Sequence, residues 1–123
     1  MATSDFKTEF YRRIYRYSLE IIKMVEALPK DQTPRILGSQ LLRSGTSVTA
    51  NIIEAKSASS KKDYINFYNH ALKSANETKL WIMLLRDSAK IEHQRAEEIL
   101  RETIEISNIL ASSIMTMKGR SKI

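Results

Sequence analysis

The sequence predicts an all-α protein, an antiparallel up-down-up-down four-helix bundle that forms a single domain over residues 1–123. Apolar residues recur at helical spacing along most of the chain, which has only three glycines and two prolines. Short breaks divide it into four segments, so consecutive helices should lie side by side in opposite directions. A chain of 123 residues has the usual length of one domain.

The first helix is expected over residues 5–28. Its apolar stripe consists of Phe10, Ile14, Tyr17, Ile21, Val25 and Leu28. Pro29 should end this helix, because a residue that precedes proline is disfavoured in the helical conformation. The second helix is expected over residues 33–56, with Thr33 as its N-cap and Pro34 in its first position.

Small residues are unusually frequent in the second helix. They are Gly38, Ser39, Ser44, Gly45, Thr46, Ser47 and Ala50. They allow a neighbouring helix to approach closely, although each interior glycine costs up to about 1 kcal/mol relative to alanine. Packing against other helices must therefore stabilise this segment.

The third helix is expected over residues 60–89, with Ser60 and Asp63 as a capping box. Its stripe consists of Tyr64, Phe67, Ala71, Ser74, Thr78, Trp81 and Leu85. The fourth is expected over residues 93–117, with Gly119 as its stop and residues 119–123 as a disordered tail. The four helices carry more apolar width than one bundle core needs, which favours self-association over a broader monomer core.

The charge is unevenly distributed over this bundle. The net charge is +6, from 20 Lys and Arg against 14 Asp and Glu. The starts of helices one and three and the ends of helices two and four share one pole. Ten basic residues fall there: Lys7, Arg12, Arg13, Arg16, Lys56, Lys61, Lys62, Lys118, Arg120 and Lys122. Only four acidic residues oppose them, so the pole carries the whole excess of +6.

Concentrated positive charge attracts polyanions such as an RNA or DNA backbone. The residues expected to bind nucleic acid are Arg12, Arg13, Arg16, Lys56, Lys61 and Lys62. Tyrosines on neighbouring turns could stack on unpaired bases, namely Tyr11, Tyr15, Tyr64 and Tyr68. The alternative is a solvated basic end without a ligand.

Enzymatic and metal sites find little support in the sequence. Without cysteine there is no disulfide scaffold, thiolate metal site or cysteine nucleophile. His70 and His93 lack the Glu-x-x-His spacing of di-iron bundles, and no glycine-rich phosphate loop exists. We therefore expect no metal, no cofactor and no enzymatic activity. A minor alternative is a ribonuclease in which His93 acts as general acid or base beside Arg86.

A structural polar network is expected to face inward from the second and third helices. Its members are Arg43, Asn51, Glu54 and Glu77. Because buried carboxylates need partners, Arg43 should pair with Glu77, and Glu54 with Lys61 or Tyr64. The N-terminus lacks the apolar region of a signal peptide, and no apolar run reaches the roughly 18–20 residues of a membrane span. A cytoplasmic location is therefore expected.

Several motifs resemble those of a bacterial four-helix-bundle family. The central one is Ser-Val-Thr-Ala-Asn-Ile-Ile-Glu-Ala over residues 47–55, preceded by Gln-Leu-Leu-Arg-Ser over residues 40–44. Ser-Lys-Lys-Asp-Tyr follows over residues 60–64, and Ala71, Ser74, Glu77 and Thr78 complete the pattern. The family is that of proteins encoded in intervening sequences of bacterial 23S ribosomal RNA genes. It is similar to the accessory variability proteins of diversity-generating retroelements.

The resemblance implies a left-handed bundle, assembly into a ring of typically five copies, and a basic surface. Through the retroelement relatives, it also implies nucleic-acid binding and association with a reverse transcriptase, and the family has no established enzymatic activity of its own. Our interpretation from the sequence is a non-enzymatic homo-oligomer that contacts the backbone of structured RNA or an RNA–DNA hybrid. A second interpretation is an adaptor that binds a protein such as a reverse transcriptase, without direct contact to nucleic acid.

Overall fold

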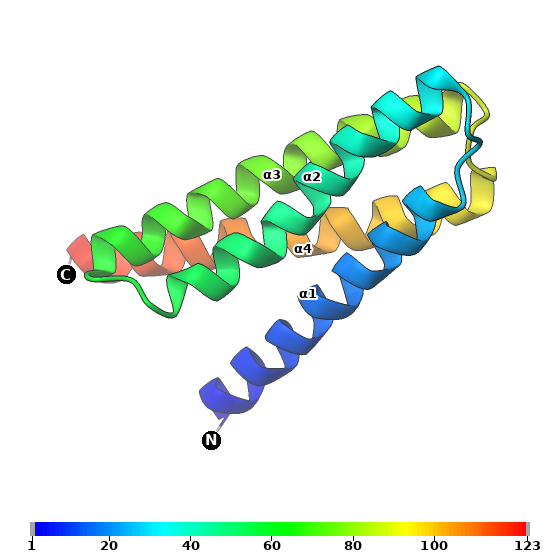
Figure 1. Ribbon diagram of the computed structural model, residues 1–123. Helices are drawn as coiled ribbons and strands as arrows, with labels where there is room; N and C mark the ends of the chain where they lie inside the picture. The colour runs from blue at the N-terminus through cyan, green and yellow to red at the C-terminus, as the bar shows by residue number, and fades with distance from the viewer. Residues whose placement is uncertain (1, 123) are drawn as a thin grey trace.

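The computed structural model describes the backbone of residues 2–122 and the side chains of residues 5–119. Along these residues the chain forms four helices and no strand. The helices are α1 (Ala2–Glu26), α2 (Gln32–Ala55), α3 (Lys61–Asp87) and α4 (His93–Lys122). They pack as an all-α bundle (Figure 1). In this part of the chain, no helix combines the length and the apolar character needed to cross a membrane.

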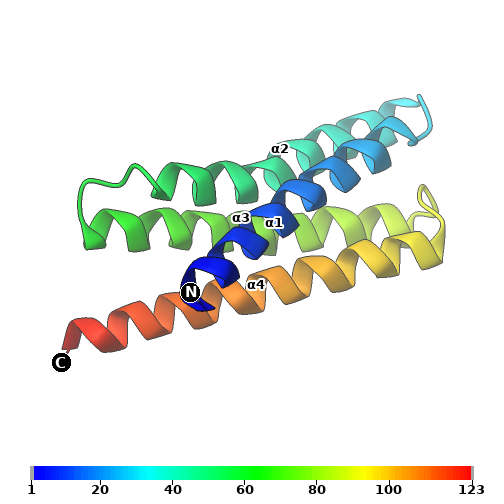
Figure 2. The same cartoon turned by 90° about the horizontal axis from the view of Figure 1, so that it is seen from below.

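The first half of α1 leaves α2 and crosses toward α4 (Figure 2). Thr49, near the end of α2, still donates to the carbonyl of Ile14 at the middle of α1 at 2.9 Å. Figures 1 and 2 show α2, α3 and α4 lying along one another, whereas α1 crosses them at an angle and passes from the side of α2 toward α4. The start of α1 therefore leaves a groove beside the start of α3 and the end of α4, as its lining residues show below.

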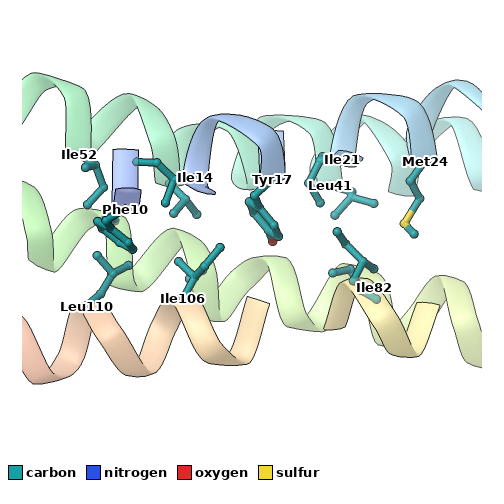
Figure 3. Packing of buried hydrophobic residues seen from close by; sticks show 14 of the residues in the cluster. Phe10, Ile14, Tyr17, Ile21, Met24, Leu41, Ile52, Ile82, Ile106 and Leu110 are labelled. Carbon is teal, nitrogen blue, oxygen red and sulfur yellow. The ribbon is translucent and has the colours of Figure 1, made fainter. Parts of the chain in front are cut away.

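The core confirms the predicted stripe of α1 and part of that of α3. On α3, Ala71, Thr78 and Leu85 are buried as predicted, whereas the other stripe residues are half-buried and Tyr68, Ala75 and Ile82 lie in the core. Figure 3 shows side chains from α1 meeting residues of the other three helices. In the α1 stripe every predicted residue except Val25 is buried, and Val25 is packed against the core. The buried residues at the centre of the other helices include Leu41, Val48, Ile52, Ile82, Leu85, Ile106 and Leu110.

The small residues of α2 allow the predicted close approach to α1. A Cβ atom placed on Gly45 would lie 3.0 Å from Cγ2 of Ile21, and one on Gly38 would lie 2.6 Å from Cδ1 of Leu28. Farther along, Ser18 Oγ lies 2.6 Å from Thr49 Oγ1. In these three contacts the residue number on α2 increases while that of its partner decreases. The two helices therefore run in opposite directions here, and the contacts fix their register.

Every helix end except the start of α4 differs from the prediction, most of them by one to three residues, and three of the differences have a clear physical reason. The N-cap of α2 is Asp31 rather than Thr33, so Pro34 is the third helical residue; this is tolerated because first-turn N–H groups have no acceptor within the helix. α1 ends at Glu26, before Leu28. α4 continues through Gly119 to Lys122. Gly119 does not adopt the positive φ of a helix stop, so the predicted tail is helical as far as Lys122, and residue 123 lies outside the described chain.

The predicted N-cap bond of α3 is confirmed, since Ser60 Oγ accepts from the Asp63 N–H at 3.0 Å. The reciprocal bond of the box is shifted by one residue, because the Asp63 carboxylate accepts from the N–H of Ser59 at 3.1 Å. The other end of α3 is a Schellman turn. The N–H of Lys90 donates to the carbonyl of Leu85 at 2.8 Å, and that of Ala89 to the carbonyl of Arg86 at 3.0 Å. Ala89 has a φ of 60°, in the left-handed region where glycine is usual.

Replacing Ala89 with glycine is expected to raise the free energy of unfolding by about 0.5–1 kcal/mol. Glycine adopts a positive φ without the steric cost of a Cβ atom. Urea unfolding followed by circular dichroism measures the change. Ala50→Gly is the matched control, because Ala50 is exposed inside α2 and should lose about 1 kcal/mol. Equal losses in both variants would contradict the prediction.

Candidate nucleic-acid interface

Five lysines gather at the end of the bundle where α2 passes into α3. Lys56 follows α2, and Lys61 and Lys62 open α3, all three exposed. Lys118 of α4 lines the same hollow as Lys62, and Lys7 of α1 lies 5.9 Å from the ring centroid of Tyr64. We call these five lysines the basic pole. Among the described residues, none of them forms an ion pair with a carboxylate.

A groove beside the basic pole is lined by aromatic rings and hydroxyl groups, and we call it the tyrosine groove. Its volume is about 370 Å³. It is lined by Phe6, Lys7, Phe10, Tyr11, Tyr64, Tyr68, Ser112, Ser113, Thr116 and Met117. The fourth candidate tyrosine, Tyr15, is 62% exposed and does not line this groove.

The tyrosines of the groove contact one another and the lysines. The rings of Tyr64 and Tyr68 stack with centroids 5.0 Å apart, and the Tyr64 hydroxyl donates to the Tyr68 oxygen at 3.2 Å. Lys56 Nζ lies 3.9 Å from the ring centroid of Tyr11, within the range of a cation–π contact. Burial raises the pKa of Tyr68 and, to a lesser extent, that of Tyr11, so both phenols are neutral near pH 7.

The buried phenols predict a loss of stability in alkali. Burial also raises the pKa of Tyr17, whose hydroxyl lies 2.6 Å from Thr103 Oγ1. Unfolded tyrosines ionise near pH 10 while the folded ones stay protonated. The contribution of these tyrosines to the free energy of unfolding is therefore fully present below pH 10. Above pH 10, each of them lowers the free energy of unfolding by up to about 1.4 kcal/mol per pH unit. Urea unfolding at pH 8, 10 and 11 should show a shallower decline in Tyr17→Phe; an unchanged slope would refute this.

The arginines predicted to bind nucleic acid differ from the lysines of the basic pole, because Arg12 and Arg13 lie close to carboxylates. Arg13 donates through Nε and Nη2 to both carboxylate oxygens of Glu102, at 2.8 and 2.7 Å. It also donates to Glu105 at 2.7 Å. These bonds raise the pKa of Arg13 and use its charge to join α1 to α4. Arg12 is exposed and lies 3.6 Å from Glu9. Arg13 is thus committed to an intramolecular contact.

Arg16 lies in a different hollow, between α1 and α4. This hollow of about 350 Å³ also holds Arg13, Glu20, Arg95, Glu98 and Glu102. It mixes both signs of charge, so it lacks the excess of cations that marks the basic pole. Because α1 crosses toward α4, Arg13 reaches Glu102 and Arg16 lies in a hollow with Glu98 and Glu102.

The polar network is only partly formed, and it does not face inward. Arg43 pairs with Glu77, as predicted, but its side chain is 55% exposed. Glu77 also accepts from Trp81 Nε1 at 3.0 Å. Asn51 instead donates to the carbonyl of Ser47 at 2.9 Å. Glu54 is exposed, and among the described residues it contacts neither Lys61 nor Tyr64 through a hydrogen bond. Solvation of these groups at the surface removes the need for a closed network.

The Arg86–His93 pair has no free guanidinium. Arg86 Nε and Nη2 donate to Asp87, and Nη1 donates to Glu97 at 2.6 Å. A phosphate would have to displace two carboxylates to reach it. Within the described chain, no group of three His, Cys, Asp or Glu side chains could hold a metal ion.

Comparisons with known proteins place these features in a family. The model of the 23S rRNA-intervening sequence protein family matches residues 7–112. The crystal structure of a protein of unknown function from the S23 ribosomal protein family of Bacteroides thetaiotaomicron is 37% identical. The matched region covers 85% of this chain and 97% of the Bacteroides chain, with a TM-score of 0.81. No curated protein matches the chain.

Proposed function

Because this chain belongs to the 23S rRNA-intervening sequence protein family, we propose that it is a non-enzymatic, oligomeric protein that binds structured RNA in the cytoplasm through its basic pole. The observation that carries this proposal is the set of five lysines without a carboxylate partner among the described residues. Phosphate oxygens supply the missing negative charge. Because phosphates are shared by all sequences, the binding has little sequence specificity, and an RNA–DNA hybrid is a ligand of the same kind.

Salt dependence tests this proposal directly. Each phosphate neutralised by a lysine contributes about 0.7–0.9 to the slope of log affinity against log salt concentration. With three or four lysines engaged, affinity should fall roughly 50-fold between 50 and 200 mM salt. Fluorescence anisotropy of a labelled RNA hairpin measures this slope. No binding at 50 mM salt, or binding indifferent to salt, would refute the proposal.

Self-association is the second part of the proposal. Leu80, Met83 and Leu84 on α3 are 44%, 36% and 42% exposed, and their spacing places them on one face of the helix. On α2, Leu42 and Ile53 are 37% and 44% exposed. A left-handed up-down-up-down bundle in a ring of five copies would cover such faces. Light scattering after size exclusion should then give the mass of five chains, and a monomer would contradict this part.

The exposed apolar side chains also favour a second candidate function. They could bind another protein, for example a reverse transcriptase, with this chain acting as an adaptor. Capture of that protein after complete nuclease treatment, together with no RNA binding at low salt, would favour the adaptor over the RNA-binding protein.

A further inference from the structure

The tyrosine groove offers more than a surface for phosphates. Its walls come from three helices: Phe6, Phe10 and Tyr11 from α1, Tyr64 and Tyr68 from α3, and hydroxyl-bearing residues from α4. We infer that this groove holds one unpaired base of the bound RNA while the basic pole holds the adjoining phosphates. This inference rests on the proposed function and adds a preference for RNA with an unpaired base.

The chemistry of the groove matches a nucleotide. One wall is aromatic and stacks on the flat face of a base, a contact that does not depend on base identity. The other wall carries the hydroxyls of Ser112, Ser113 and Thr116, which donate to or accept from the polar edge of a base. A purely apolar ligand would leave these hydroxyls without partners. The volume of about 370 Å³ lies within the range of small-ligand pockets.

Tyr64 is the side chain best placed to stack on the base. Tyr68 stacks on it with centroids 5.0 Å apart. Lys7 Nζ lies 5.9 Å from the Tyr64 centroid, at the outer limit of a cation–π contact. A base that stacks on Tyr64 extends the existing ring pair, and Lys7 moves to the phosphate of the same nucleotide.

The charges around the groove complement a nucleic-acid strand. Lys56 lies against Tyr11 at 3.9 Å, Lys61 precedes Tyr64 by one helical turn, and Lys118 directly follows Met117 of the groove. Lys7 lines the groove itself and Lys56 borders it through Tyr11, while Lys62 and Lys118 line the neighbouring hollow. Phosphates on either side of an inserted base would each meet a cation, and a fully paired duplex keeps its bases inside the stack.

The test compares three labelled RNA hairpins that differ at one position: fully paired, with a single-nucleotide bulge, and with an abasic site in the bulge. The full-length protein should bind the bulged RNA roughly 5- to 100-fold more tightly than the abasic RNA, the range for one stacked base. Tyr64→Leu should abolish this difference, and Tyr64→Phe should keep it. Tyr15→Leu is the matched control and should leave it unchanged.

A fluorescent 2-aminopurine in the bulge gives a direct readout, because stacking quenches it. Quenching by the wild type and by Tyr64→Phe, but not by Tyr64→Leu, is the expected result. Equal affinity for all three hairpins, or quenching that survives Tyr64→Leu, would overturn the base site and leave phosphate binding intact. Failure to bind any hairpin at low salt would instead refute the proposed function itself.

Discussion

Replacing Lys56, Lys61 and Lys62 together with glutamate is expected to lower the affinity for structured RNA by roughly 100-fold or more in 50 mM salt. Three attractive contacts with phosphates become repulsive, and each change is worth on the order of 1 kcal/mol or more near a protein surface. The slope of log affinity against log salt concentration should fall by about 2–3. All three lysines are exposed, so the fold should persist.

The control variant reverses three cations at the opposite end of the bundle. Lys30 lies between α1 and α2, Arg35 in the first turn of α2, and Lys90 between α3 and α4; both connections lie at the end away from the α2–α3 turn (Figure 1). Either triple change lowers the net charge from +6 to zero. If total charge alone determined binding, both variants would lose affinity equally, and that outcome would contradict a site at the basic pole.

Replacing an arginine of α1 and replacing a lysine of the basic pole should have different effects. Arg13 already donates to Glu102 and Glu105, so its replacement by methionine should affect the contact between α1 and α4 more than the binding of RNA. Among the described residues, the ammonium group of Lys56 contacts the ring of Tyr11 and no carboxylate. Counting charges along the sequence treats these residues alike, because both are basic and belong to the same predicted pole.

The fold could be predicted from the sequence because its signals are local. Period-3.6 stripes, Pro29 and the Ser60–Asp63 capping box depend on neighbours within a few residues. The partners of Arg13 could not be predicted this way, because they depend on the angle at which α1 crosses α4. The acidic residues Glu98, Glu102 and Glu105 lie at helical spacing on α4, which is the one sequence signal that could have suggested an acidic face there.

Two errors have a common cause. Gly119 and Pro34 were expected to mark helix ends, yet both lie inside helices. A glycine lowers helix propensity by only about 1 kcal/mol, and a proline in the first turn removes no hydrogen bond. Such residues permit a boundary without imposing one. The exposure of Arg43 has a different origin, since the apolar face of α2 is shared between contacts with α1 and α3, and pattern alone does not show where that face ends.

Replacing Ile106 with alanine is expected to lower the free energy of unfolding by about 2–5 kcal/mol. Ile106 is fully buried, and Figure 3 shows it among Phe10, Ile14 and Leu110 at the meeting of α1 and α4. The loss combines the transfer of the missing carbons with the cavity they leave. A domain of this size has a stability of only about 5–15 kcal/mol, so the variant should unfold at a markedly lower urea concentration.

Ile104→Ala provides the matched control and also reports on the oligomer. Ile104 undergoes the same chemical change on the same helix, but it is 41% exposed, so the single chain should lose less than about 1 kcal/mol. Similar losses in both variants at low protein concentration would show that this core assignment is wrong. A large Ile104 loss that appears only at high concentration would have a different meaning: since mass action links folding to assembly, it would place Ile104 beneath a second copy of the chain.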